Sequence, residues 1–137
     1  MKITSQWKDG FASVIDNGRN HQVTVDLPWL QHGKDQGPTA LELSVMGYAG
    51  CITTVFAMMA EKMKFSFSEM TCEMAVERGE KSITKIEIKL KLSSDASREK
   101  IQKAFDMTCN HCPVGVIFVQ AGIEIRSELI VSTETSA

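Results

Sequence analysis

The sequence predicts an α+β fold in which antiparallel sheets surround one long, buried central helix. Stretch 37–64 is the longest apolar segment of the chain and opens with a helix-start signal. Residues 83–92 alternate strictly between apolar and charged side chains, which is typical of a strand with one buried face. Shorter alternating runs lie on either side. The expected order is three strands, a long helix, two strands, two helical pieces and a strand.

The central helix is predicted from its start signal and from its apolar composition. Thr39 and Glu42 have the spacing of a capping box, and Pro38 favours a turn just before them. Apolar residues then cover nearly every face, as expected of a helix that is buried on all sides. These residues are Leu41, Leu43, Val45, Met46, Ala49, Ile52, Val55, Phe56, Met58 and Met59.

Two features bear on what covers this helix. Glu42 and the Glu61–Lys62 end leave it short of the roughly 18–20 uninterrupted apolar residues of a usual membrane span, so no membrane partner is expected. A chain of 137 residues with six strands has too little material to cover every side of it. The sequence therefore predicts a homodimer with a large apolar interface.

Three short strands are expected before the helix, at residues 3–7, 11–15 and 21–27. Asp16-Asn17-Gly18 is a strong hairpin signal, because Asn-Gly tolerates the positive φ of such turns. The three strands therefore form a meander. Residues 28–38 are a loop by composition, since glycines and two prolines break any period there.

After the helix the period changes to that of strands. Residues 65–78 are strand-like in part, and residues 83–92 are the clearest strand in the chain. Asp95 and Ser97 are candidate caps for a helix that begins at about Arg98. A second helical piece spans 114–121 and ends at Gly122, and a last strand spans 123–131. The Thr/Ser-rich tail is expected to fray.

Composition places the chain among soluble globular proteins of one domain, residues 1–137. The hydrophobic fraction is 43% and the charged fraction 23%. A net charge of −2 provides no field that would gather nucleic acid. The start, MKITSQWKDG, lacks the apolar core of a signal peptide. We therefore expect a cytoplasmic protein whose four cysteines are reduced at rest.

Cys51 lies in the middle of the central helix, next to Gly50. Small neighbours leave room for another backbone or a small substrate to approach the sulfur, whereas a buried cysteine that merely fills space is the competing interpretation. Tyr48 lies on the same face and can donate a hydrogen bond. Glu42 stands about 13 Å away along the axis. It is either a helix cap or a carboxylate of the site.

Cys112 directly precedes Pro113, which places it as the N-cap of the second helical piece, where the helix dipole favours a thiolate. With Cys109 it forms a Cys-x-x-Cys pair, which occurs in redox motifs and zinc sites. Zinc needs about four ligands, and the other candidates, Cys72, His21 and His32, are not at ligand spacing. No metal or other cofactor is expected. A Cys109–Cys112 dithiol is more plausible than zinc but lacks the strand-to-helix context of a thioredoxin-like site, and His111 is interpreted as a solvated loop residue.

The motifs around these residues resemble the OsmC/Ohr family, most closely its OsmC-like branch. They are Gly37-Pro38-Thr39, Leu41-Glu42-Leu43, Gly50-Cys51 and Cys112-Pro113-Val114. The resemblance implies an intertwined dimer with two sites at the subunit interface and thiol-dependent reduction of organic hydroperoxides. Cys51 would attack the peroxide and Cys112 would resolve the sulfenic acid as a disulfide. Glu42 matches the glutamate of the OsmC-like branch, whereas the peroxidase members carry theirs at the position of Leu41.

The leading hypothesis is thus a peroxidase whose thiolate displaces an alkoxide and whose disulfide is reopened by an external dithiol. An apolar pocket lined by Met46, Tyr48, Phe56 and Val116 would suit a small apolar hydroperoxide. The peroxidase members hold the thiolate with an arginine, but the corresponding region here reads GFAS at residues 10–13. Two alternatives follow, a non-catalytic dimer that binds a small apolar ligand and a slow redox sensor. Cys109 is a possible extra thiol.

Overall fold

The computed structural model describes residues 1–133, and the chain divides into two compact units. The first comprises Met1–Met46 and the second Gly47–Ala137, and each is described by itself. The predicted fraying of the tail concerns residues 134–137, which lie outside the described residues.

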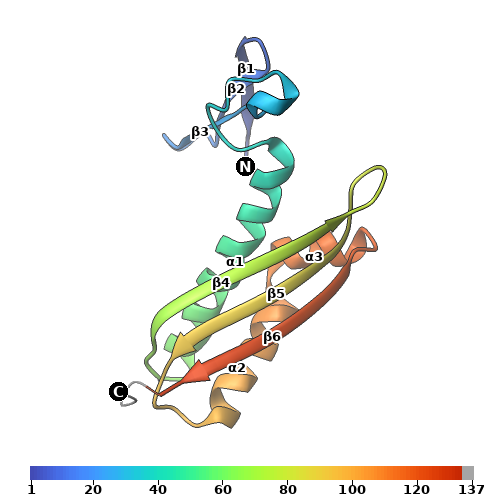
Figure 1. The fold of residues 1–137 in the computed structure, drawn as a ribbon. Helices are drawn as coiled ribbons and strands as arrows, with labels where there is room; N and C mark the ends of the chain where they lie inside the picture. Colours follow the sequence, from blue (N-terminus) through green and yellow to red (C-terminus); the bar gives the residue numbers. More distant parts are fainter. Residues whose placement is uncertain (134–137) are drawn as a thin grey trace. The chain divides into compact units, whose positions relative to one another are not determined.

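The first unit contains a three-stranded sheet in the order β1-β2-β3 (Figure 1). The strands are β1 (Thr4–Asp9), β2 (Ala12–Asp16) and β3 (Gln22–Val25), and both pairings are antiparallel. The predicted meander is confirmed, with strand ends shifted by one or two residues. Gly18, in the predicted hairpin turn, has φ +81°, a backbone conformation that residues other than glycine rarely adopt.

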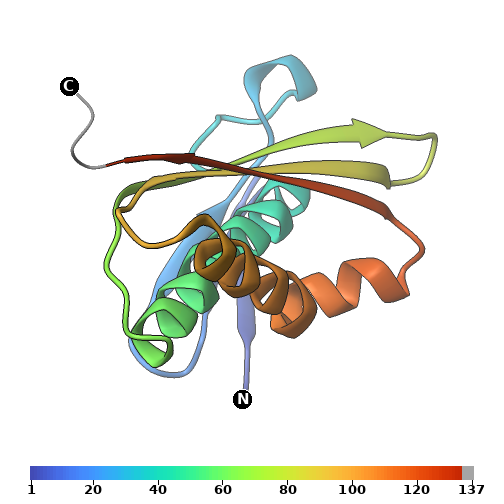
Figure 2. The same ribbon diagram turned by 90° about the horizontal axis from the view of Figure 1, so that it is seen from below.

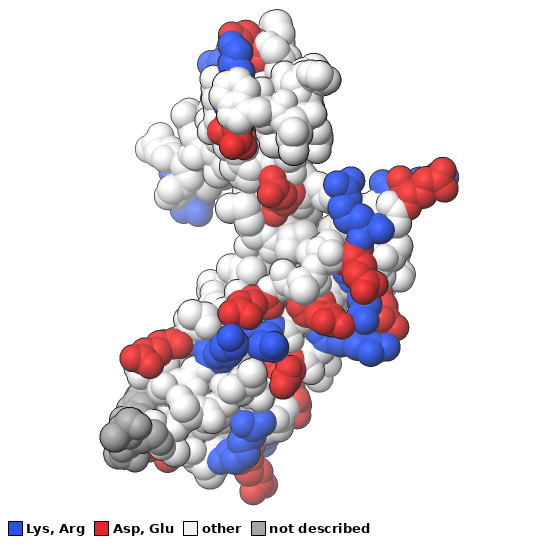
Figure 3. Space-filling view, in the orientation of Figure 1, with Lys and Arg blue, Asp and Glu red and all other residues white. Residues whose placement is uncertain are grey.

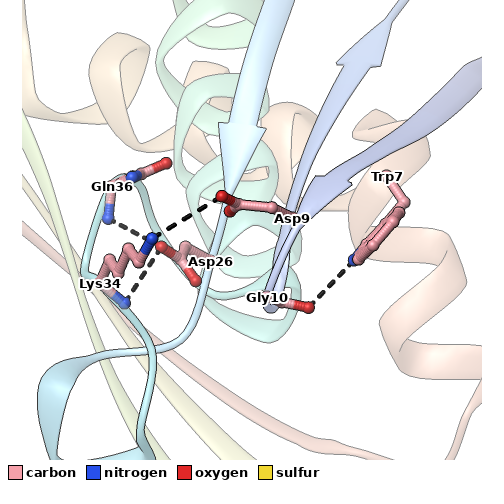
Figure 4. A network of polar contacts seen from close by, with 6 residues as sticks. All are labelled: Trp7, Asp9, Gly10, Asp26, Lys34 and Gln36. Atoms are coloured by element: carbon pink, nitrogen blue, oxygen red, sulfur yellow. Dashed lines mark hydrogen bonds and ion pairs between the residues drawn. The ribbon is translucent and has the colours of Figure 1, made fainter.

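The segment after β3 is an ordered loop built around the buried carboxylate of Asp26. This carboxylate accepts hydrogen bonds from the backbone N–H groups of Gln36 (3.2 Å) and Lys34 (3.3 Å), which Figure 4 shows, and from that of Leu27 (2.7 Å). Burial alone would raise the pKa of Asp26, but the three N–H donors hold it below its ordinary value. A short 3-10 helix, η1 (Trp29–Gln31), lies within the loop. The sequence indicated only that this segment was irregular.

Helix α1 (Ala40–Lys62) begins with the predicted capping box. The Thr39 backbone N–H donates to the Glu42 carboxylate at 2.9 Å, and the Glu42 N–H donates to the Thr39 hydroxyl at 3.0 Å. Burial on all sides was expected, but only one stripe of α1 is buried in the described chain. This stripe consists of Tyr48, Ile52, Val55, Phe56 and Ala60. Met58 is 59% exposed, because the described chain covers one face of the helix.

By length and composition alone, α1 is apolar enough to cross a membrane. The sequence argument that its charged residues leave it too short is therefore wrong. Hydropathy averaged over the helix tolerates a glutamate near one end.

The second unit contains a sheet in the order β4-β5-β6. Strands β4 (Ser68–Arg78) and β5 (Ile83–Ser93) pair antiparallel, whereas β5 and β6 (Glu124–Ser132) pair parallel. Antiparallel sheets were predicted, and this prediction is wrong for the parallel β5–β6 pair. Two helices, α2 (Arg98–His111) and α3 (Pro113–Gln120), connect these strands and return the chain to the end where β5 began. The predicted cap of α2 is confirmed, because the Ser97 hydroxyl accepts from the Lys100 N–H at 3.2 Å.

The helices of the second unit, including residues 47–62 of α1, lie against one face of the sheet (Figure 2). The apolar side chains of β5 turn toward them, since Ile86, Ile88, Leu90 and Leu92 are at most 3% exposed. The opposite face carries interspersed acidic and basic side chains (Figure 3), such as Lys91 and Glu73, whose charged atoms are 3.1 Å apart. The predicted alternation of β5 is thus confirmed.

Candidate active site at the Cys51–Cys112 thiol pair

Two cysteines that are distant in the chain lie together in the second unit. Cys51 is on α1, and Cys112 lies at the junction of α2 and α3. The two side chains are within hydrogen-bonding contact. Cys112 is completely buried, whereas Cys51 is partly exposed, and both are free thiols. A partly exposed cysteine is therefore paired with a fully buried one.

Cys112 is the N-cap of α3, as predicted. Pro113 occupies the first helical position, and the Gly115 backbone N–H donates to the Cys112 sulfur at 3.3 Å. This bond alone would stabilise a thiolate. Burial and the hydrogen bond with Cys51 nevertheless raise the pKa of Cys112 to about 11. The predicted thiolate-favouring effect is therefore wrong in its net sign, since burial outweighs the N–H donors, and Cys112 keeps its proton at neutral pH.

The aromatic ring of Tyr48 lies one helical turn before Cys51 on α1. Its ring is 3% exposed and stacks on Phe118 of α3, with centroids 5.1 Å apart and planes 18° apart. Gly115 makes room for this ring, because a Cβ at that position would stand 3.1 Å from Tyr48 Cε1. Burial, together with the nearby thiols, raises the pKa of Tyr48 to about 12. The phenol therefore stays protonated and is a potential donor.

The remaining two cysteines also lie in the second unit. Cys72, on β4, is partly exposed, and burial followed by the proximity of Cys109 raises its pKa to about 11. Burial raises the pKa of Cys109 as well, although a hydrogen bond with Ser127 of β6 opposes this effect. Within the described residues, no group of three or more histidine, cysteine or acidic side chains is arranged to hold a metal ion.

The other predicted site residues have different surroundings. Glu42 and Met46 belong to the first unit, and the hydrogen bonds of Glu42 are those of the helix cap. Phe56 is completely buried and packs edge-on against Phe65 and Phe67, so its ring is in the core of its unit. Val116 is 41% exposed on α3. The roles of these four residues in a site stay predictions.

His111 is the last residue of α2 and not part of a loop. Its Nδ1 lies 2.8 Å from the Met107 carbonyl oxygen, to which it can only donate. The ring is exposed, as the solvated interpretation predicted.

Two residues that shape the site were missing from the sequence predictions, namely Gly115 and Phe118. N-cap side chains accept from the backbone N–H two or three positions later, so the spacing from Cys112 to Gly115 was an available signal. Phe118 follows Gly115 by three residues and therefore lies on the same face of α3. Nothing local indicated that this face meets Tyr48.

The fold matches solved structures over nearly the whole chain. An OsmC-like protein from Mycoplasma pneumoniae aligns with a TM-score of 0.84 at 16% identity, covering 95% of each chain. An organic hydroperoxide resistance protein from Legionella pneumophila aligns with a TM-score of 0.67 at 15% identity, covering 96% of this chain and 98% of that one. OhrB of Bacillus subtilis aligns with a TM-score of 0.62 at 19% identity, covering 93% and 96%. At these identities the likeness concerns the fold. No curated protein matches the sequence.

An α+β fold of two small sheets and a long helix, with a cysteine on that helix and a second before α3, thus defines a protein of OsmC-like architecture. The family model for OsmC-like proteins matches residues 33–128. The chain belongs to the OsmC-like protein family. This family includes organic hydroperoxide resistance peroxidases, and its members typically form dimers. Within this soluble fold, α1 is the core helix and not a membrane span.

Proposed function

We propose that this protein is a cytoplasmic thiol-dependent peroxidase that reduces organic hydroperoxides and acts as a homodimer. The observation that carries the proposal is the contact between the Cys51 and Cys112 side chains, which come from different helices. A peroxidase of this kind needs two thiols close enough to become a disulfide. Membership of a family that includes hydroperoxide resistance proteins supports the same reaction.

In the proposed reaction, Cys51 attacks as a thiolate. Its sulfur bonds to one peroxide oxygen, the O–O bond breaks, and the alkoxide leaves and takes up a proton to become the alcohol. Cys51 is thereby oxidised to a sulfenic acid. Cys112 then bonds to the Cys51 sulfur, and the hydroxyl group leaves as water with the Cys112 proton. A pKa of about 11 makes Cys112 a poor candidate for the first attack, because the thiolate is the attacking species.

A dithiol reductant must return the enzyme to its starting state. One thiolate of the reductant attacks the disulfide, and the second releases the reductant as its own disulfide. The apolar side chains near the thiols support a preference for alkyl hydroperoxides over hydrogen peroxide. Tyr48 and Val116 are the proposed contacts for the alkyl group, with Met46 and Phe56 as further candidates. Glu42, in the first turn of α1, is proposed as a further catalytic residue.

The test is consumption of cumene hydroperoxide in the presence of dithiothreitol. We expect catalytic consumption by the wild type, the uncatalysed rate for Cys51→Ser, and wild-type behaviour for the matched control Cys72→Ser. Hydrogen peroxide should be the poorer substrate. Wild-type activity no higher than that of Cys51→Ser would overturn the proposal.

A second function is favoured by one feature of the sequence, the absence of an arginine from residues 10–13. Without that cation, the same pair of thiols can belong to a dimer that binds a small apolar ligand or that senses oxidants slowly. Ligand binding predicts a raised melting temperature and no turnover. Sensing predicts a Cys51–Cys112 disulfide that forms over many minutes, which mass spectrometry after mild oxidation detects.

A further inference from the structure

Cys109 lies three residues before Cys112, one helical turn away along α2. The Cys112 backbone N–H donates to the Thr108 carbonyl at 3.0 Å, so the helical path of α2 continues as far as Cys112. Residues three apart on a helix have Cβ atoms about 5–6 Å apart. Helix geometry places the Cα atoms of such residues about 5 Å apart, within the roughly 4.4–6.8 Å that disulfides span. The Cβ atoms must approach to about 3.5–4.5 Å, which requires an adjustment at the junction of the two helices.

Cys112 therefore lies between two thiols. Cys51 is in hydrogen-bonding contact with it from α1, and Cys109 lies one helical turn back on α2. All four cysteines, including Cys72 on β4, interact electrostatically with the phenol of Tyr48. The exposures differ, because Cys112 is 0% exposed whereas Cys109 is partly exposed.

We propose that Cys109 is a second resolving thiol, which moves the disulfide from Cys51–Cys112 to Cys109–Cys112. This inference rests on the proposed function, which forms the first disulfide. The Cys109 thiolate bonds to the Cys112 sulfur, the bond between Cys112 and Cys51 breaks, and Cys51 leaves as a thiolate. The proton lost by Cys109 balances the one that Cys51 can take up. The protein gains and loses no electrons in this exchange.

The exchange has a consequence for stoichiometry. Once Cys51 is free again, it can react with another peroxide before any reductant arrives. Wild-type protein without reductant should therefore consume two equivalents of peroxide per chain, the second ending as a Cys51 sulfenic acid. Cys109→Ser should consume only one, because its Cys51 stays in the disulfide with Cys112. The serine hydroxyl can retain the hydrogen bond to Ser127, and circular dichroism checks that the variant folds.

The experiment measures this initial consumption of peroxide, called the burst, and combines it with peptide mapping. Reduced protein, freed of reductant, receives excess cumene hydroperoxide together with dimedone, which traps sulfenic acids, and is then alkylated and digested with trypsin. Cleavage at lysine and arginine places Cys51 in peptide 35–62, and Cys109 with Cys112 in peptide 104–126. The moved disulfide is internal to the second peptide and leaves Cys51 free to carry dimedone. The Cys51–Cys112 disulfide instead links the two peptides.

We expect the wild type and the control Cys72→Ser to give a burst of two equivalents, an internal disulfide in 104–126 and dimedone on Cys51. Cys109→Ser should give one equivalent and linked peptides. Cys51→Ser should give no internal disulfide on this timescale. Linked peptides as the end state of the wild type, with a burst of one, would overturn the exchange and leave the peroxidase intact. No burst and unmodified Cys51 would overturn the peroxidase itself, and the exchange with it.

Discussion

Replacing Gly115 by alanine tests whether the packing of Tyr48 against α3 holds the thiol pair in place. The new Cβ would stand 3.1 Å from Tyr48 Cε1 and 3.2 Å from its Oη, closer than ordinary van der Waals contact. Tyr48 is 3% exposed and stacked on Phe118, so the ring has little freedom to withdraw. Either the ring or the first turn of α3 must shift. That turn carries the N–H that donates to Cys112.

Two effects of opposite sign determine the magnitude. Alanine is favoured over glycine in a helix by roughly 0.5–1 kcal/mol. An extra methyl group in a well-packed core costs typically about 1–3 kcal/mol. The contact is a few tenths of an ångström too close, against a buried ring that is stacked on Phe118, so we expect the cost to dominate. The net loss in the free energy of unfolding should be about 1–2 kcal/mol.

Urea denaturation under reducing conditions measures this loss, with a fall in midpoint at unchanged m-value. In a Tyr48→Leu background the same substitution should cost less, because the ring that the methyl meets is gone. Gly47→Ala on α1 is the matched control, since a Cβ there meets nothing within 4 Å in the described chain. An equal or greater stability for Gly115→Ala, or an equal cost in both backgrounds, would refute this reasoning.

Three further predictions concern charge and capping. The raised pKa of Cys112 means that the unfolded thiol ionises near pH 9 while the folded one keeps its proton to about pH 11. The folded state then binds more protons, so stability falls as pH rises through this window, by at most about 2 kcal/mol. Urea midpoints of reduced wild type should fall more steeply between pH 9 and 11 than those of Cys112→Ser. An equal dependence of the midpoint on pH in the two proteins would contradict this prediction. Glu42→Gln should retain the cap whereas Glu42→Ala loses about 0.5–1 kcal/mol. A catalytic carboxylate would show as peroxidase activity lost in both variants, although Glu42→Gln keeps its stability. The lowered pKa of Asp26 gives stability that is present above its unfolded pKa and lost as pH falls through the lower, folded value. Asp26→Asn should reduce this acid dependence of the melting temperature, and an unchanged dependence would exclude Asp26 as its source.

Features that depend on a few neighbouring residues were predictable from the sequence. The capping box at Thr39 and the caps at Ser97 and Cys112 are hydrogen bonds between residues three apart, so their spacing predicts them. Strand β5 was equally clear, because its charged and apolar residues alternate without a break. Family membership was accessible through the motifs around Cys51 and Cys112 for the same reason.

Features that depend on tertiary contacts were not predictable. The parallel pairing of β6 follows from the path of α2 and α3 between the strands, which alternation within β6 does not encode. The three donors of Asp26 come from up to ten residues away along an irregular loop. The expected direction of the Cys112 pKa shift was wrong, because the sequence indicates an N-cap but does not indicate complete burial.

The most direct test is a single turnover of reduced Cys109→Ser protein, in which Cys109 cannot move the disulfide away from Cys51. One equivalent of cumene hydroperoxide is added, and tryptic peptides are analysed without reduction. The account predicts that peptide 35–62 becomes linked to peptide 104–126 through Cys51 and Cys112, in step with loss of the peroxide. Peroxide that persists, or oxidised Cys51 that never links to Cys112, would contradict it.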